Sequence, residues 1–380
     1  MGLRWERASG RPGPCSGSNG KGFREMKSQV FFVPARRDEG DPALAMKAEQ
    51  AYLALGLNDL IEVDSYVALK IHFGEKGNSG YIKPAWLERL IWQVRRRTQR
   101  SFLTDSNTLY TGKRSNAVDH LQLAYEHGFT PDKTAIPVLI ADGLLGNDDE
   151  EIKVDLPRIK SAKIGRTIVH SDVLICLSHF TGHVVTGLAC AIKNLGMGCA
   201  ARAGKLDQHS EVHPRVLRKA CRNCSICLDY CPAGAIIQSD GSVEIQDAKC
   251  TGCGECLVVC KWGAIKMRWD EDSARTQEKT AEYAWSVRHA LKGKVGFLNF
   301  LLKITKDCDC MAKDQPPIVD DIGILSSLDP VALDKASADL VLKKAGGDIL
   351  RRGYDIDWAV QLRHGERIGL GSMDYKLTAV

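Results

Sequence analysis

The chain of 380 residues is 44% hydrophobic and 26% charged, with a formal net charge of +5 at pH 7. This composition is typical of a soluble globular protein, and the length is long for one domain and short for three. Several basic residues fall within the first 40 positions, so the mild charge leaves no basic stripe for a nucleic-acid partner.

Neither a signal peptide nor a membrane span is predicted. No apolar segment follows the N-terminus, which argues against secretion. The longest stretch free of Lys, Arg, Asp and Glu, residues 173–192, contains Ser178, His179, His183 and Thr186 and is too polar to cross a membrane. A cysteine-rich chain of this kind belongs in a reducing compartment, so we predict a cytoplasmic protein without disulfides.

The first 26 residues have the composition of a disordered tail. From Gln29 onward, largely apolar strands alternate with helices. This alternation predicts an α/β fold with a mostly parallel sheet flanked by helices on both faces. The predicted strands span residues 29–33, 66–73, 101–104, 137–141, 172–177 and 294–302. The predicted helices span residues 42–55, 84–97, 117–127, 184–195, 277–291, 331–344 and 358–367.

Two cysteine quartets interrupt this alternation, each with the spacing C-x2-C-x2-C-x3-C and 29 residues apart. In the bacterial ferredoxin pattern, the fourth cysteine of each quartet ligates the cluster of the other. A zinc ribbon needs only four ligands, and disulfides are not expected here. We therefore predict two [4Fe–4S] clusters, one held by Cys221, Cys224, Cys227 and Cys260, and one held by Cys250, Cys253, Cys256 and Cys231.

The cysteine-rich segment, residues 217–268, is predicted to be a small 2[4Fe–4S] ferredoxin-like α+β domain. Since strands and helices resume after it, we predict that it is inserted into one α/β domain made of residues 27–216 and 269–380. Three successive domains are the alternative, because the last piece is just long enough to fold alone.

Polar loops follow five predicted strands, and in open α/β sheets the ligand crevice lies outside the carboxyl ends of the strands. We predict a site there, with His72, Asp105, His179 and His183 as candidate catalytic or metal-binding residues. Asp142 ends another strand, but Asp142-Gly143 alone is better explained as a turn. A single strand-end histidine is more often a hydrogen-bonded loop residue, so the prediction depends on several loops agreeing.

Two further segments carry candidate residues. Lys193 and Asn194 begin a glycine-rich segment that either cradles an anion or cofactor or simply ends a helix. Cys308 and Cys310 alternate with aspartates after an apolar strand. Three interpretations of the pair stay open: an additional metal ion shared with His72 or His179, a redox-active thiol pair, or two ordinary loop cysteines.

Six stretches of this sequence resemble the uncharacterised iron–sulfur centre proteins called domain of unknown function 362. They are residues 69–75, 103–110, 178–183, 193–199, 307–310 and 322–325. The resemblance implies one family domain from Lys27 to Tyr375 with an inserted two-cluster ferredoxin unit, and it implies no substrate. Lys261, in place of the proline that usually follows the last cysteine, and the N-terminal tail depart from the pattern.

These observations predict an iron–sulfur protein that transfers electrons to or from a site or partner on the α/β domain. An oxidoreductase of this kind would use a redox partner protein or a small-molecule substrate. Two alternatives stay open. One is a ferredoxin-type carrier or cluster-handling protein without catalysis of its own, and the other is a purely structural role for the clusters.

Overall fold

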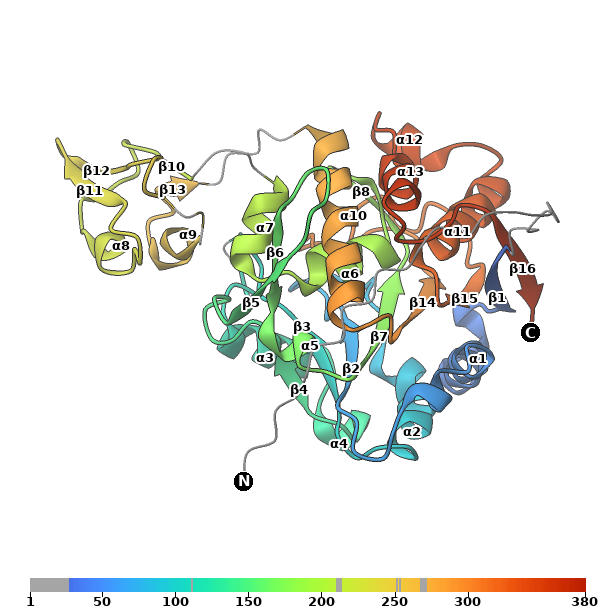
Figure 1. Ribbon diagram of the computed structural model, residues 1–380. Coiled ribbons are helices and arrows are strands. Elements are labelled where there is room, and N and C mark those ends of the chain that lie inside the picture. Colours follow the sequence, from blue (N-terminus) through green and yellow to red (C-terminus); the bar gives the residue numbers. More distant parts are fainter. Residues whose placement is uncertain (1–26, 111, 210–213, 251, 253, 267–271) are drawn as a thin grey trace, which may run out of the picture.

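The computed structural model describes residues 27–110, 112–209, 214–250, 252, 254–266 and 272–380 (Figure 1). The predicted tail of residues 1–26 lies outside the described residues, and so does the candidate ligand Cys253. The part of the chain that is described forms an α/β domain and a smaller cysteine-rich unit beside helix α7 (Arg202–His209).

Eight strands form the central sheet, in the order β16-β1-β15-β14-β7-β2-β3-β4. Five neighbouring pairs are parallel, and β15 pairs antiparallel with both β1 and β14. The predicted mostly parallel sheet is therefore confirmed, although the pattern predicted neither β15 nor β16. The strands are β1 (Ser28–Pro34), β2 (Val67–Ile71), β3 (Ser101–Asp105), β4 (Val138–Ile140), β7 (Val173–His179), β14 (Val295–Leu301), β15 (Gly323–Ser327) and β16 (Tyr375–Ala379).

Helices cover both faces of the sheet (Figure 1). One hydrophobic core lies beneath α1 and α2 and includes Leu44 and Leu90, and the other lies beneath α6, α10 and α11 and includes Leu195 and Val331. The helices are α1 (Asp41–Ala54), α2 (Glu88–Arg95), α3 (Ala117–Glu126), α4 (Pro131–Thr134), α5 (Arg166–Val169), α6 (Ala191–Cys199), α10 (Ser273–Ala290), α11 (Pro330–Ala345), α12 (Ile349–Gly353) and α13 (Val360–Arg367). Short 3-10 helices span Arg37–Glu39, Leu57–Leu60 and Pro84–Leu87.

Helix α11 illustrates how local sequence fixes these elements. The Asp329 carboxylate accepts hydrogen bonds from the backbone N–H groups of Val331 and Ala332, which have no partner inside the helix. Pro330 follows at the first helical position, where its missing N–H costs nothing. Gly346 ends the helix in the left-handed conformation that glycine adopts without strain.

The prediction of a helix over residues 184–195 is wrong at its start. A short hairpin, β8 (Thr181–His183) with β9 (Gly187–Ala189), comes first, and α6 begins only at Ala191. Gly187 explains the break, because its φ of +67° is incompatible with a helix. A second hairpin, β5 (Asp149–Lys153) with β6 (Ser161–Gly165), and helix α7 were not predicted.

The cysteine-rich unit has two small antiparallel sheets and two short helices. They are β10 (Arg215–Val216) paired with β13 (Ile265–Lys266), β11 (Ile236–Ser239) paired with β12 (Ser242–Ile245), α8 (Ile226–Asp229) and α9 (Glu255–Val259). It begins at Arg215, two residues before the predicted boundary. Its own apolar cluster includes Ile236, Val243 and Leu257, and among the described residues of the α/β domain only Leu109 and Leu206 join that cluster.

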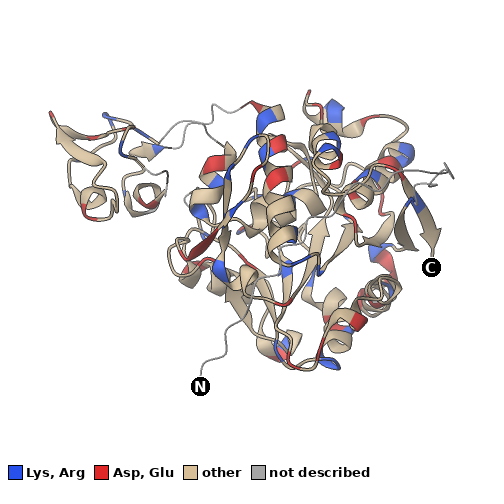
Figure 2. Cartoon of the chain, viewed as in Figure 1, with Lys and Arg blue, Asp and Glu red and all other residues tan. Residues whose placement is uncertain are grey.

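Charged residues of both signs are interspersed along the helices that flank the sheet (Figure 2). Such a mixed-sign pattern is that of a solvated surface. Across the described part of the chain, no helix combines the length and apolar character that a bilayer crossing requires.

Candidate functional site

A cavity of about 520 Å³ opens at the carboxyl ends of β2, β3 and β7. The chain adds β3 and β4 on one side of β2 and then places β7 on the other side, so the cavity lies where the strand order reverses. Open α/β sheets bind their ligands at such a reversal. Its lining includes Lys70, His72, Asp105, Leu109, Arg114, His179, His183, Lys193, Asn194, Lys205, His209, Cys308, Asp309 and Cys310. The four candidate strand-end residues, His72, Asp105, His179 and His183, therefore lie around one space.

A buried ionic network forms one wall of the cavity. The Lys70 ammonium lies 2.9 Å from the Asp105 carboxylate, and both side chains are almost fully buried. The Lys70 Nζ also donates to Asn194 Oδ1 at 2.7 Å, while Arg114 lies 3.6 Å from the other Asp105 oxygen. Burial alone raises the pKa of Asp105, but Lys70, together with His120, whose Nε2 lies 3.6 Å from the carboxylate, outweighs burial and holds the pKa well below its ordinary value. Asp105 is therefore an anion that positions cations.

Lys193 and Lys205 line the cavity without an ion pair to a carboxylate of the described residues, but the Lys205 ammonium donates to the Ser106 hydroxyl and the Ala200 carbonyl, and no such bond is found for Lys193 among those residues. Burial, together with the positive charges of Arg114 and Lys70, lowers the pKa of Lys193 to about 8. An ammonium in these surroundings is ready to bind an anion.

Asn194 does not extend this anion-binding role. Its amide nitrogen donates to the Leu177 carbonyl and the Ser178 hydroxyl at 2.9 and 3.0 Å, and its oxygen accepts from Lys70. All of these bonds hold α6 against β2 and β7. Of the two predicted cofactor-binding residues, only Lys193 has its polar group available.

His72 and His179 differ in protonation. Both nitrogens of His179 are engaged, Nδ1 by Asp309 at 2.8 Å and Nε2 by the Leu302 carbonyl at 2.7 Å. Because both partners are acceptors, both nitrogens donate and the ring is a structural imidazolium; in keeping with this, the Asp309 carboxylate outweighs burial and raises the pKa of His179. In His72, Nδ1 accepts from the Gly74 N–H at 3.0 Å. Burial and Arg114 hold the pKa of His72 well below its ordinary value, which leaves a neutral ring with its proton on Nε2.

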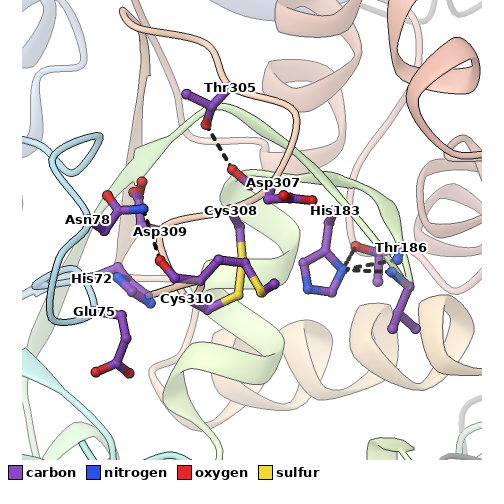
Figure 3. Close-up of a disulfide and its surroundings, with 12 residues drawn as sticks. His72, Glu75, Asn78, His183, Thr186, Thr305, Asp307, Cys308, Asp309 and Cys310 are labelled. Atoms are coloured by element: carbon purple, nitrogen blue, oxygen red, sulfur yellow. Dashed lines mark hydrogen bonds between the residues drawn. A yellow bond between two sulfur atoms is a disulfide. The ribbon is translucent and has the colours of Figure 1, made fainter. Parts of the chain in front are cut away.

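Cys308 and Cys310 form a disulfide in the cavity lining (Figure 3). The prediction of a chain without disulfides is therefore wrong at this pair. The histidine beside the two sulfurs is His183, with a ring nitrogen within 4.8 Å of each. One of the three open interpretations is a metal ion shared with His72 or His179, and His179 does not fit it, because both nitrogens of that ring have other partners.

Sequence reasoning missed several charged residues of the cavity. Lys70 carried a usable signal, since a lysine inside the apolar strand β2 must be buried and paired. Arg114 carried none, because it lies in a loop and meets Asp105 only in the folded chain. Asp142, in contrast, is not part of the lining, and its carboxylate accepts from the backbone and side chain of Asn107.

The thiols of the cysteine-rich unit gather in two groups. Cys221, Cys224, Cys227 and Cys260 line one small hollow, whereas Cys231, Cys250 and Cys256 line another. Burial and the neighbouring Cys260 thiol, followed by Cys221 and Cys224, raise the pKa of Cys227 to about 11. Four thiols drawn together in this way fit one [4Fe–4S] cluster, and each group contains one cysteine from the other quartet, as ligand crossing requires.

The second group of thiols lies next to the cavity. A Cβ atom on Gly254 would be 3.0 Å from the Arg202 side chain and 3.5 Å from Leu109. Arg202 is also 3.7 Å from the Glu255 carboxylate, which joins α7 to α9. Cys256 and Leu109 belong to the same apolar cluster, and Leu109 lines the cavity. Leu109 therefore contacts the cysteine-rich unit and also forms part of the cavity wall.

A family model described as domain of unknown function (DUF362) matches residues 67–339. This range includes β2, β3, β7, the cysteine-rich unit and the disulfide. Both the cavity and the cysteine quartets therefore fall within the matched region.

Relatives with assigned names match shorter segments. An iron–sulfur protein of Rhodospirillum rubrum is 37% identical in an alignment of 90 residues that covers 21% of this chain and 47% of that protein. Hydrogenase-4 component A of Escherichia coli (strain K12) is 34% identical over 74 residues, 19% of this chain and 34% of that protein. The chain thus spans less than half the length of either relative. The lactate racemase apoprotein from Thermoanaerobacterium thermosaccharolyticum aligns with a TM-score of 0.37 and 11% identity, over 73% of this chain and 51% of that chain.

Proposed function

The chain belongs to the DUF362 family, and from this premise we propose that it is an iron–sulfur oxidoreductase acting on a small anionic molecule in the strand-end cavity. The names of the relatives, an iron–sulfur protein and a hydrogenase component, support the iron–sulfur part of the proposal. The cavity and its charges support the rest.

The residues that would hold two [4Fe–4S] clusters are the two groups of thiols described above, with Cys253 completing the second group. When bound, such clusters supply one-electron transfer at low potential. The cysteines of the second group are the ones that adjoin the α/β domain, through Gly254, Arg202 and Leu109.

The observation that carries the proposal is the position of Leu109. It packs with Cys256 in the apolar cluster of the cysteine-rich unit, and it also lines the cavity. Leu109 therefore belongs both to the wall of the cavity and to the apolar cluster that contains a cysteine of the second group. A carrier protein without a substrate of its own would not need a cavity at this place.

The charges of the cavity favour an anionic ligand. Lys70, Arg114, Lys193 and Lys205 line it, against the carboxylates of Asp105 and Asp309. Asp309 is already paired with His179, and Asp105 with Lys70. Lys193 would bind the anion, and neutral His72 would donate its Nε2–H to an oxygen that gains negative charge.

Anaerobic purification followed by iron and sulfide analysis tests the cluster content, with about eight irons per chain expected. Protein reduced with dithionite should give an EPR signal. It should then be reoxidised by at least one small anionic electron acceptor from a panel of 2-oxo carboxylates, unsaturated carboxylates and nitro carboxylates. That reoxidation should saturate with concentration and should be lost in Lys193→Ala.

Lys335→Ala is the matched control, because Lys335 pairs with Asp339 on the outer surface of α11. Clusters that dithionite cannot reduce would favour a structural role. Clusters that reduce reversibly but whose reoxidation is independent of Lys193 would favour the carrier alternative.

A further inference from the structure

The Cys308–Cys310 disulfide has no part in the function proposed above, although both residues line the cavity. The disulfide lies in the loop after β14. His72 lies on one side of it and His183 on the other (Figure 3). A disulfide that lines a ligand cavity is reachable by a small molecule, unlike one buried in a core.

The loop that carries the disulfide is held from both sides by backbone hydrogen bonds. The Gly182 N–H donates to the Thr305 carbonyl at 2.9 Å, and the Glu75 N–H donates to the Asp309 carbonyl at 2.9 Å. The Thr305 hydroxyl donates to the Asp307 carbonyl at 2.8 Å. Because these bonds do not involve sulfur, the two cysteines would stay close together after the S–S bond is broken.

His183 presents a hydrogen-bond donor to the sulfurs. Its Nδ1 faces the backbone N–H groups of Val185 and Thr186 at 3.2 and 3.1 Å, and these groups can only donate. Among the described residues, the Thr186 hydroxyl, 3.0 Å away, is the one neighbour that could accept from Nδ1, whereas the two backbone N–H groups can only donate to it. Nδ1 is therefore the acceptor, and the proton is on Nε2. Figure 3 shows the nitrogen without hydrogen bonds on the side of the two sulfurs.

We propose that Cys308 and Cys310 form a redox-active pair that is reduced by dithiol compounds in the cavity, with the Nε2–H of His183 donating to the thiolate that is released. A thiolate of the dithiol attacks one sulfur, the S–S bond breaks, and the other cysteine leaves as a thiolate. The second thiol of the dithiol then displaces the first cysteine. The dithiol loses two electrons and two protons and becomes a cyclic disulfide, and the cysteine pair gains both.

A metal ion on His183, Cys308 and Cys310 is the competing interpretation, since the three donor atoms lie within 4.8 Å of one another. A metal would need the lone pair of Nε2, and that nitrogen carries the proton while two backbone donors occupy Nδ1. Metal-bound histidines instead donate their other N–H to an acceptor. The hydrogen bonds around His183 thus favour thiolate stabilisation over metal binding.

The test uses the full chain, dithiothreitol as the dithiol, and iodoacetamide followed by peptide mass spectrometry. In the wild-type protein, dithiothreitol should make the peptide with Cys308 and Cys310 gain two carbamidomethyl groups, and oxidised dithiothreitol should reverse this. The buried Cys199 is the internal control and should stay unlabelled in the native protein. The measurement does not depend on the clusters, so its failure and the failure of the proposed function are distinguishable.

Variants of His183 test its role as donor. His183→Leu should lower the alkylation rate of the reduced pair about tenfold at pH 7, because less of the pair is thiolate. His183→Gln, which keeps an N–H donor, should recover most of the rate. A pair that dithiothreitol cannot reduce would overturn the proposal. So would stoichiometric zinc that is lost in the double variant Cys308→Ser, Cys310→Ser, or equal rates in wild type and both His183 variants.

Discussion

The backbone N–H of Gly182 donates to the carbonyl of Thr305 at 2.9 Å, which joins the β8–β9 hairpin to the loop that carries Cys308 and Cys310. The approach is so close that a Cβ atom on Gly182 would lie 2.3 Å from the Lys306 carbonyl oxygen. Only glycine allows this contact, and it is the contact that brings His183 next to the disulfide.

Gly182→Ala should therefore destabilise the protein and move the disulfide loop. The clash involves backbone atoms, so we expect a loss of about 1–3 kcal/mol in the free energy of unfolding. Denaturant titration of both proteins measures it. Gly112→Ala is the matched control, since a Cβ there would meet Glu75 at an ordinary 3.7 Å. Equal stability of the two variants would mean that the loop adjusts freely.

Cys260→Ala should remove the cluster of the first quartet and spare that of the second. The reason is that Cys260 lines the same hollow as Cys221, Cys224 and Cys227. Iron analysis should fall from about eight to about four irons per chain, and EPR identifies the cluster that remains. Cys199→Ala removes a buried thiol outside the cysteine-rich unit and should keep all the iron. Loss of the second cluster instead would contradict ligand crossing.

Asp105→Asn should cost about 3–5 kcal/mol of stability, because it leaves the buried Lys70 ammonium without its anion. The pKa of Asp105 is lower in the folded than in the unfolded chain. The contribution of the Asp105 carboxylate to the free energy of unfolding is therefore complete above about pH 4 and is lost as the pH falls further. The variant should lose this part of the acid dependence of the unfolding free energy. Asp320→Asn, on an exposed residue, should change neither property.

Lys193→Ala should weaken anion binding in the cavity about tenfold or more, as expected for one charged hydrogen bond. Calorimetry with acetate and with inorganic phosphate measures the affinity. Since burial first, and then Arg114 and Lys70, lower the pKa of Lys193 to about 8, wild-type affinity should fall as the pH rises through about 8. An unchanged affinity in Lys193→Ala, or a wild-type affinity that is flat from pH 7 to 9, would contradict this role.

Replacing residues 215–266 by a short Gly/Ser linker should leave a folded, iron-free α/β domain. Among the described residues, neither large hydrophobic core contains a member of this segment. The segment begins and ends at the paired residues Arg215 and Lys266, so its ends are about 5 Å apart and easily joined. Circular dichroism and limited proteolysis check the product. An unfolded product would show that the cysteine-rich unit is needed for the fold.

The sequence by itself determined the α/β class and the two cysteine quartets. Strands such as β2 and β7 are buried on both faces, so each is a near-continuous apolar run that can be recognised without a structure. The quartets are equally local, because three ligands of each cluster must come from one short loop. The strand-end rule also indicated His72, Asp105, His179 and His183 as neighbours, and all four line the cavity.

Only the tertiary structure decided what those neighbours do. Asp105 became a structural anion because Lys70 and Arg114 meet it from different segments, and His179 became an imidazolium because Asp309 and Leu302 take its two nitrogens. His183 lies beside Cys308 and Cys310 because its neighbour Gly182 packs against Thr305. Gly182 and Thr305 are more than 120 residues apart in the sequence. Charge state and partner are set by contacts between distant segments, so a local pattern such as Lys70 in an apolar strand can indicate a buried, paired charge but cannot identify its partner.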